Sequence, residues 1–363
     1  VLYLGVVLTV YWLLFTVVLG PYSALLPEIA TSGRGRIVLS STMGMFGAIG
    51  MIIGGASGEF ISQFPDGMTL LGVHIPSGIQ VVGLFGGACI LLCLMPALNI
   101  RETPHSKAKE IDTGVIDGIR DAARNASFFP VVGIAFRFRF SGTMIAAMLP
   151  YLTTVALERL PGQEGLVAEG MGEAWQSRLL AIVLGGALLW LPFIHKIGER
   201  VSHKALMMFA AGLYAAGLLL MPASLWLDDP AWGIVVIMVL LSFPTCIALV
   251  MPLVLFAEVI DYDETISGLR REGIYNGSVA LLTKWADGLA RVAVVSLLVL
   301  GSSKADASGV WAIAPAAGVV MLLGMVSFAF YPEQAMKEAI KAHHQQRVQA
   351  RGDEAAEGEA KPT

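Results

Sequence analysis

Three charged residues lie in the middle of a long apolar stretch, where charges are rarely found. Lys284, Asp287 and Arg291 are spaced by three and four residues, so a helix would place them on one face. Asn276 and Thr283 extend this polar side. A charge in membrane hydrocarbon costs at least about 2.5–3.5 kcal/mol, so such a group usually faces a cavity or a partner. The stripe therefore either lines a water-filled pathway or forms an ion-pair network that locks the helix to a neighbour.

Two arginines, Arg137 and Arg139, lie about two turns into another apolar stretch. Alternate positions on a helix point about 200° apart, so both cannot face one cavity, and one of them can snorkel towards the cytoplasm. A guanidinium at this depth needs an acidic partner. Asp287 is the best candidate within the apolar stretches. We therefore predict an ion pair with Asp287 and assign Arg139 to the same polar pathway.

The short segment 257–273 holds charges of both signs. This density suits an ion-pair latch at one end of a moving helical bundle, and breaking such pairs would let that end open. The alternative is a solvated loop. The candidate gate residues are Glu258, Asp261, Tyr262, Arg270 and Glu272.

The elements that must position these residues are apolar helices. The 363 residues are 56% apolar and 14% charged, with a mean hydropathy of +0.71, whereas a soluble chain has about 25% charged residues. Each stretch reaches the roughly 20 residues that a helix needs to cross a bilayer. We predict an all-α membrane protein with spans at 2–27, 37–60, 79–98, 130–156, 174–194, 205–226, 231–256, 274–300 and 309–331.

Basic residues alternate between the gaps. Seventeen of the 24 Lys and Arg residues lie in every second segment between the predicted spans, counting the C-terminal tail, and two lie in the remaining segments. Loops rich in Lys and Arg face the cytoplasm, so we assign the basic segments to the cytoplasmic side. The C-terminus is then cytoplasmic, and the chain is expected in a bacterial-type inner (plasma) membrane. The chain begins with Val1 inside an apolar helix that no basic region precedes. A fragment that lacks its earlier helices is the simplest interpretation, and a non-standard start codon is the alternative.

The longest connection, residues 99–129, separates three spans from six. Apolar residues recur at helical spacing between 111 and 119, which predicts a short amphipathic helix on the cytoplasmic surface. The predicted organisation is therefore residues 1–98 as the end of a first bundle, 99–129 as a middle loop, 130–331 as a six-helix bundle and 332–363 as a disordered tail.

Several classes of function have no support in the sequence. Nucleic-acid binding would call for a basic stripe interleaved with aromatic residues, and the sequence has none. The sequence also lacks the Gly-x-Ser-x-Gly, P-loop and His-Glu-x-x-His motifs, so it gives no support for an enzyme. The three cysteines all lie within spans and suggest neither disulfides nor a metal site.

The run AEVIDYDETISGLRREGIYNGSVALLTK, from Ala257 to Lys284, resembles the glycoside–pentoside–hexuronide:cation symporter family, which includes the melibiose carrier. That family has an Ala-Asp-x-x-Asp-Tyr motif, a following Arg-x-Glu and a Lys in its eleventh helix. The matching positions are Ala257, Asp261, Tyr262, Arg270, Glu272 and Lys284, and Glu258 replaces the first Asp. The run GPYSALLPEI, from Gly20 to Ile29, is similar to the end of the family's fourth helix.

The resemblance implies a major facilitator fold with nine of its twelve transmembrane helices present, beginning at the fourth. It also implies cation-coupled symport of a sugar or glycoside by alternating access, with a sodium ion or proton as coupling ion and no other cofactor. Thr16 matches the family's cation-site Thr, and Tyr22 would line the same half of the path. Leu19 stands where the family has an Asp ligand, which weakens the case for the standard sodium site.

Two alternatives remain open beside sugar symport. The cargo could be a lysolipid or another amphiphile, carried without sodium coupling. The chain could also be an inactive truncated remnant. The partners expected are a small, sugar-like solute and membrane lipid.

Overall fold

The computed structural model describes most of the chain after residue 125 and parts of the chain before it. The described residues are 3, 6, 7, 9–11, 13–15, 33–55, 57, 61, 64, 67–70, 72–93, 125, 127–158, 165–198, 200–268, 272–343 and 345. The amphipathic helix predicted near residues 111–119 lies outside them.

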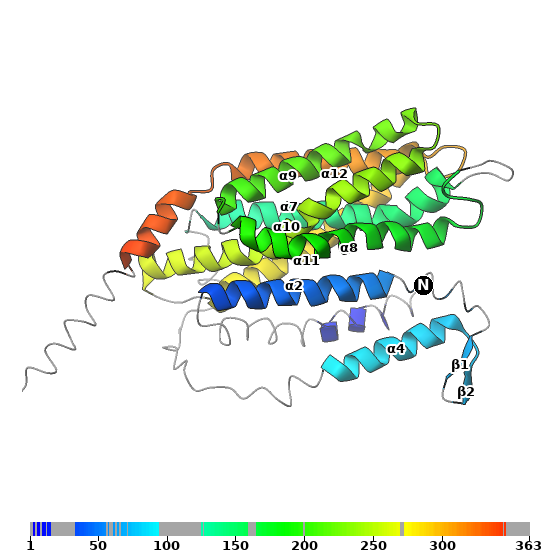
Figure 1. The fold of residues 1–363 in the computed structure, drawn as a ribbon, viewed down its shortest axis with the longest axis horizontal. Helices are drawn as coiled ribbons and strands as arrows, with labels where there is room; N and C mark the ends of the chain where they lie inside the picture. The colour runs from blue at the N-terminus through cyan, green and yellow to red at the C-terminus, as the bar shows by residue number, and fades with distance from the viewer. Residues whose placement is uncertain are drawn as a thin grey trace, which may run out of the picture.

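The described elements are helices and one small hairpin (Figure 1). The first part of the chain holds α2 (Gly33–Gly55), strands β1 (Met68–Leu70) and β2 (Val73–Ile75), and α4 (Gly78–Cys93). The second part holds α7 (Phe128–Tyr151), the π-helical turn η1 (Leu152–Leu157), α8 (Gly172–Gly198), α9 (His203–Leu220), the 3-10 turn η2 (Met221–Trp226), α10 (Pro230–Ser267), α11 (Glu272–Leu298) and α12 (Ser308–Phe328). The antiparallel strands pair Met68 with Ile75.

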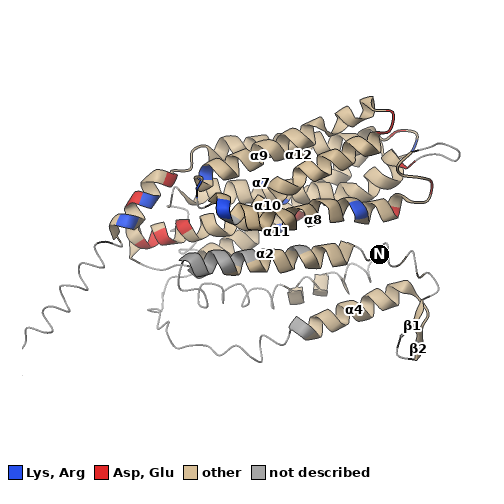
Figure 2. Cartoon of the chain, viewed as in Figure 1, with Lys and Arg blue, Asp and Glu red and all other residues tan. Residues whose placement is uncertain are grey.

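Five helical segments are long and apolar enough to cross a membrane. They are Phe128–Leu157, Gly172–Ile194, His203–Trp226, Pro230–Ser267 and Ser308–Phe328. The helix α11 is also long, with 27 residues, but it carries Lys284, Asp287 and Arg291 in its apolar middle. The charged residues otherwise gather towards the ends of the helices (Figure 2). The predicted total of nine spans stays a prediction, because part of the chain lies outside the described residues.

The helices α7 to α12 pack into one bundle with an apolar core. The helix α7 lies against α11 and α12, α10 lies against α8 and α9, and α9 also packs on α12. The helix α2 runs along α8 and α10, and α4 lies farther out (Figure 1). Lipid is as apolar as the helix surfaces, so association depends on close packing at small residues. Fully buried residues of this core include Met148, Leu152, Met207 and Ile234.

Gly186 marks one such close approach, between α8 and α10. A Cβ placed there would lie 2.6 Å from Cβ of Ser242, whereas one at the neighbouring Gly185 would meet nothing within 4 Å. We expect Gly186→Ala to reduce the free energy of unfolding by about 1–3 kcal/mol through overpacking. The matched Gly185→Ala variant should be neutral or slightly stabilising. Denaturant titration in detergent would measure both, and equal stabilities would contradict the close α8–α10 crossing.

Three segments differ from the sequence prediction. The predicted gap 257–273 is helical up to Ser267, where Gly268 adopts a left-handed φ of +67° and donates its N–H to the carbonyl of Glu264. The predicted gap 61–78 contains the β1–β2 hairpin. The predicted disordered tail contains a helix over residues 333–343, and Glu333 is buried. Hydropathy locates the part of a helix in the membrane, whereas caps and tertiary contacts decide where the helix ends.

Candidate functional site

Asp287 lies at the centre of a polar contact between α7 and α11. Arg139 donates from Nε to Oδ1 at 2.7 Å and from Nη2 to Oδ2 at 2.8 Å, so the guanidinium and the carboxylate form a bidentate pair. Thr143, one turn farther along α7, donates its hydroxyl to Oδ1 at 2.6 Å. The Asp287 side chain is 12% exposed and that of Arg139 is 53% exposed. The carboxylate is therefore enclosed by donors, while part of the guanidinium stays accessible.

The ion pair that the sequence predicted for Asp287 is thus confirmed, with Arg139 as the partner. Arg137 points away from it, and its Nη1 donates to the carbonyl of Gly133 at 2.9 Å and to the hydroxyl of Ser327 on α12 at 3.3 Å. The angle of about 200° between alternate helix positions explains this separation. One arginine serves the α7–α11 contact, and the other serves the α7–α12 contact.

The other residues of the predicted stripe also lie on α11. The ammonium of Lys284 is 5.3 Å from the centre of the Phe15 ring, a distance typical of a cation–π contact. Arg291 follows the carboxylate by one turn and is exposed. Thr283 donates its hydroxyl to a carbonyl of its own helix, and Asn276 is half-buried near the start of α11. The described part of this face therefore carries two basic groups, Lys284 and Arg291, on either side of one carboxylate, and α7 adds Arg139 as a third.

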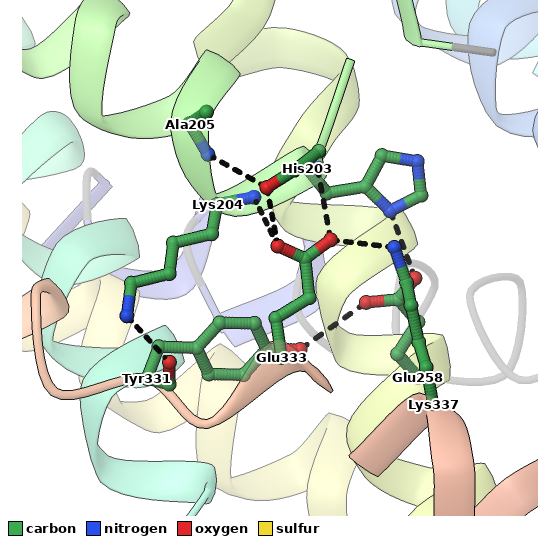
Figure 3. Close-up of polar contacts among 8 residues, drawn as sticks. His203, Lys204, Ala205, Glu258, Tyr331, Glu333 and Lys337 are labelled. Atoms are coloured by element: carbon green, nitrogen blue, oxygen red, sulfur yellow. Dashed lines mark hydrogen bonds and ion pairs between the residues drawn. The ribbon is translucent and has the colours of Figure 1, made fainter. Parts of the chain in front are cut away.

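A second polar cluster joins the start of α9, the second half of α10 and the segment after α12 (Figure 3). We call it the Glu258–Glu333 cluster; its members are Ser202, His203, Lys204, Glu258, Tyr331, Glu333 and Lys337. One oxygen of Glu258 lies 2.8 Å from Nδ1 of His203, and the other accepts from the Tyr331 hydroxyl at 3.2 Å. Burial and then the charge of Glu258 raise the pKa of Tyr331, so the phenol remains protonated and donates. Lys204 donates from Nζ to the Tyr331 carbonyl at 2.8 Å.

Glu333 caps the first turn of α9. Its carboxylate accepts from the backbone N–H of His203 at 3.0 Å and of Lys204 at 3.2 Å, and from the hydroxyl of Ser202. Lys337, one turn later, pairs with the same carboxylate. Burial alone would raise the pKa of Glu333, but the hydrogen bonds from Lys337 and Ser202 and the charge of Lys337 outweigh it and hold this pKa below its ordinary value. A negative charge also stabilises the N-terminal end of a helix.

The structure places the remaining predicted residues as follows. Asp261 and Tyr262 are half-buried on α10, on the turn after Glu258. Glu272 begins α11, and its side chain is outside the described part. Thr16, Tyr22 and Arg270 lie outside the described residues. Among the predicted gate residues that the structure describes, Glu258 contacts other members of the Glu258–Glu333 cluster.

Sequence reasoning missed Thr143 and most of the Glu258–Glu333 cluster. Thr143 could have been found, because it follows Arg139 by four residues and so shares its helix face. Ser202 precedes an apolar run and is a usual helix-start residue, but nothing in the sequence connects it to Glu333. That contact depends on how the segment after α12 folds back onto α9, and hydropathy does not report it.

Residues 1–334 match the family of sequences described as MFS/sugar transport protein, which is nearly the whole chain. This chain belongs to that family. Over 320 residues it is also 25% identical to an uncharacterized symporter of Synechocystis sp., and the match covers 83% of the chain. The chain spans about half the length of this curated relative, 53%.

Membership of the MFS/sugar transport family confirms the resemblance found in residues 257–284. Together with the five long apolar helices, it identifies the chain as an integral membrane protein. The two polar sites accordingly differ in setting. The Arg139–Asp287 pair lies within the apolar part of α7 and α11, whereas the Glu258–Glu333 cluster lies near helix ends.

Proposed function

We propose that the chain works in a secondary active transporter that couples uptake of a sugar or glycoside to a sodium or proton gradient by alternating access. Two findings support this proposal: the sugar transport family to which the chain belongs, and the name symporter carried by its Synechocystis relative. The observation that carries the mechanism is the bidentate Arg139–Asp287 pair between two helices. Ionisable residues inside membrane helices commonly mark ion and substrate paths.

In this proposal the carboxylate of Asp287 exchanges partners during the cycle. A proton or a sodium ion that reaches its oxygens competes with the guanidinium of Arg139, and oxygen atoms are the ligands that hard cations prefer. Release of the guanidinium frees its donors for hydroxyl groups of the solute. Because the two residues lie on different helices, the exchange also loosens α7 from α11. Ion binding, solute binding and helix movement are then coupled at one carboxylate.

The Glu258–Glu333 cluster is proposed as part of the gate at one end of the bundle, whereas the Arg139–Asp287 pair lies midway along its helices. It ties α9, α10 and the segment after α12 by hydrogen bonds that can break one at a time. Glu258 is the cluster member that is also among the gate residues predicted from the sequence. From the basic gaps we infer that this end of the bundle faces the cytoplasm. Opening towards the cytoplasm would therefore strain or break this cluster.

Lys284 provides the test of the pathway. In this proposal the ammonium of Lys284, on the same helix face as Asp287, donates a charge-assisted hydrogen bond to the solute. Such a bond contributes about 1.5–3 kcal/mol, and 1.4 kcal/mol corresponds to tenfold, so we expect Lys284→Gln to lower gradient-driven uptake about tenfold or more. Lys304→Gln is the matched control, since Lys304 is outside the helices and pairs loosely with Glu158 at 3.4 Å. Uptake of labelled sugars and glycosides into proteoliposomes, under imposed sodium or proton gradients, is the measurement.

The same assay separates the proposal from its rivals. Uptake that follows one gradient and stops with an ionophore supports symport. Uptake of a labelled lysolipid that ignores both gradients supports the amphiphile carrier instead. No uptake of either class by correctly folded protein supports the inactive remnant, and both of these outcomes contradict the proposal.

A further inference from the structure

A cavity of about 480 Å³ lies between α7, α11 and α12, away from the Arg139–Asp287 pair. Phe129, Phe136 and Phe140 of α7 line it, with Leu282 from α11 and Val320 from α12. Its lining is apolar apart from Arg137. From Phe129 to Phe140 the helix rises by about 16 Å, so the cavity is an elongated groove along α7.

The groove opens on an exposed apolar surface. On its α11 side Leu281 and Trp285 are exposed, and on its α12 side Val319 and Leu323 are exposed. Phe129, within the groove, is itself 59% exposed. In an integral membrane protein, large apolar side chains exposed along the middle of a helix meet acyl chains. The groove is thus accessible from the bilayer.

Arg137 brings a positive charge into this apolar groove without a carboxylate partner among the described residues. Nη1 donates to the Gly133 carbonyl and the Ser327 hydroxyl, both neutral acceptors. A guanidinium has five N–H donors, so Nε and Nη2 keep three more. Gly133 is one turn earlier on α7, so the side chain reaches back towards the start of the helix. An arginine in this setting is stabilised by an anion that approaches from the same end.

Two glycines shape the space around Arg137. A Cβ on Gly324 of α12 would lie 2.7 Å from Cδ of Arg137, and a Cβ on Gly133 would lie 2.9 Å from its Nη1. Any larger residue at either position would push the arginine out of its present place. The arginine is therefore held by packing from both helices and is not a loosely attached surface charge.

We propose that this groove binds one anionic phospholipid of the surrounding bilayer, with the headgroup phosphate on Arg137 and an acyl chain along Phe136, Phe140 and Val320. The planar guanidinium fork matches phosphate oxygens, and its free donors supply a bidentate contact. The aromatic and aliphatic lining supplies the apolar contact for the chain. The site is distinct from the proposed solute pathway, because Arg137 and Arg139 point to different helices.

Native mass spectrometry of the purified full chain, after exposure to phosphatidylglycerol or phosphatidylcholine, tests the proposal. The unmodified chain should keep one phosphatidylglycerol through delipidation and should lose phosphatidylcholine. Arg137→Gln should weaken phosphatidylglycerol binding about tenfold or more, which corresponds to one charge-assisted contact. Arg178→Gln is the matched control, because it also removes an arginine from an apolar helix. Arg178 lies on α8, 5.4 Å from the centre of the Trp175 ring, and does not line the groove. It should bind phosphatidylglycerol normally.

A second variant keeps the proposal testable if Arg137→Gln fails to fold. Val320→Phe fills the groove but leaves the guanidinium in place, and it should also reduce phosphatidylglycerol retention. Arg137→Lys retains the charge and should bind better than Arg137→Gln. Equal retention of the two lipids by the unmodified chain would overturn the headgroup contact. Unchanged phosphatidylglycerol binding in Val320→Phe would overturn the position of the acyl chain.

Discussion

Asp287→Ala should reduce the free energy of unfolding by about 1–3 kcal/mol, the usual cost of leaving partly buried donors without their acceptor. The substitution leaves the guanidinium of Arg139 and the hydroxyl of Thr143 without their shared acceptor. Both groups lie on the apolar part of α7, where water replaces the carboxylate poorly. Chemical denaturation in detergent, followed by tryptophan fluorescence, would measure the change. A loss below about 1 kcal/mol would mean that the pair is solvated, as surface ion pairs are.

A double variant separates stability from transport. Arg139→Met combined with Asp287→Leu removes both charges and fills similar volume, so we expect most of the lost stability to return. Gradient-driven uptake should stay abolished, because the exchangeable carboxylate is gone. If uptake returned together with stability, the pair would be purely structural, and the ion-pair network that locks α11 to its neighbour would be the correct interpretation of the stripe.

The Arg139–Asp287 contact could be predicted from sequence because membrane hydrocarbon permits few arrangements of charge. A carboxylate and two guanidinium groups occur in apolar stretches, and each needs a partner. Helix geometry then shows that Arg137 and Arg139 cannot both face that partner. The same reasoning, extended by one turn, would have included Thr143. The helices themselves were predictable for the same reason, because continuous apolar runs leave the backbone no alternative in lipid.

The Glu258–Glu333 cluster could not be predicted in this way, since its charges lie near helix ends, where water can solvate them. Hydropathy falls after residue 256, which from the sequence alone predicts the end of a span. The helix α10 continues to Ser267, because an amphipathic segment can extend a helix beyond the bilayer until a glycine caps it. The polar composition of residues 332–343 similarly predicts a solvated tail. Their helix is joined to the bundle through the buried Glu333.

Glu333→Gln tests that connection through its dependence on pH. The folded-state pKa of Glu333 is held below its ordinary value of 4.5, so its ionised form stabilises the fold at neutral pH. This stabilisation is complete above the unfolded-state pKa and is lost as pH falls through the folded-state pKa. The unmodified chain should therefore lose stability as the pH falls below about 4.5, and part of that loss should be absent from Glu333→Gln. At neutral pH we expect the variant to be less stable by about 2–3 kcal/mol, because a carboxylate with a helix cap and an ion pair is lost.

Glu338→Gln is the control, because Glu338 is an exposed glutamate that directly follows Lys337 in the same segment. It should change neither the stability at neutral pH nor its decline in acid. If Glu333→Gln and Glu338→Gln behave alike, the cap on α9 contributes nothing, and the cluster cannot hold the three elements together. If Glu333→Gln alone is destabilised, the Glu333 cap contributes free energy that must be overcome before this end of the bundle can open. Coupling free energies between linked sites are typically about 1–3 kcal/mol, so a coupling ion can supply this amount. The carboxylate of Asp287 and the cap of Glu333 would then be two contacts of comparable strength, one broken by the ion and the other by the movement that follows.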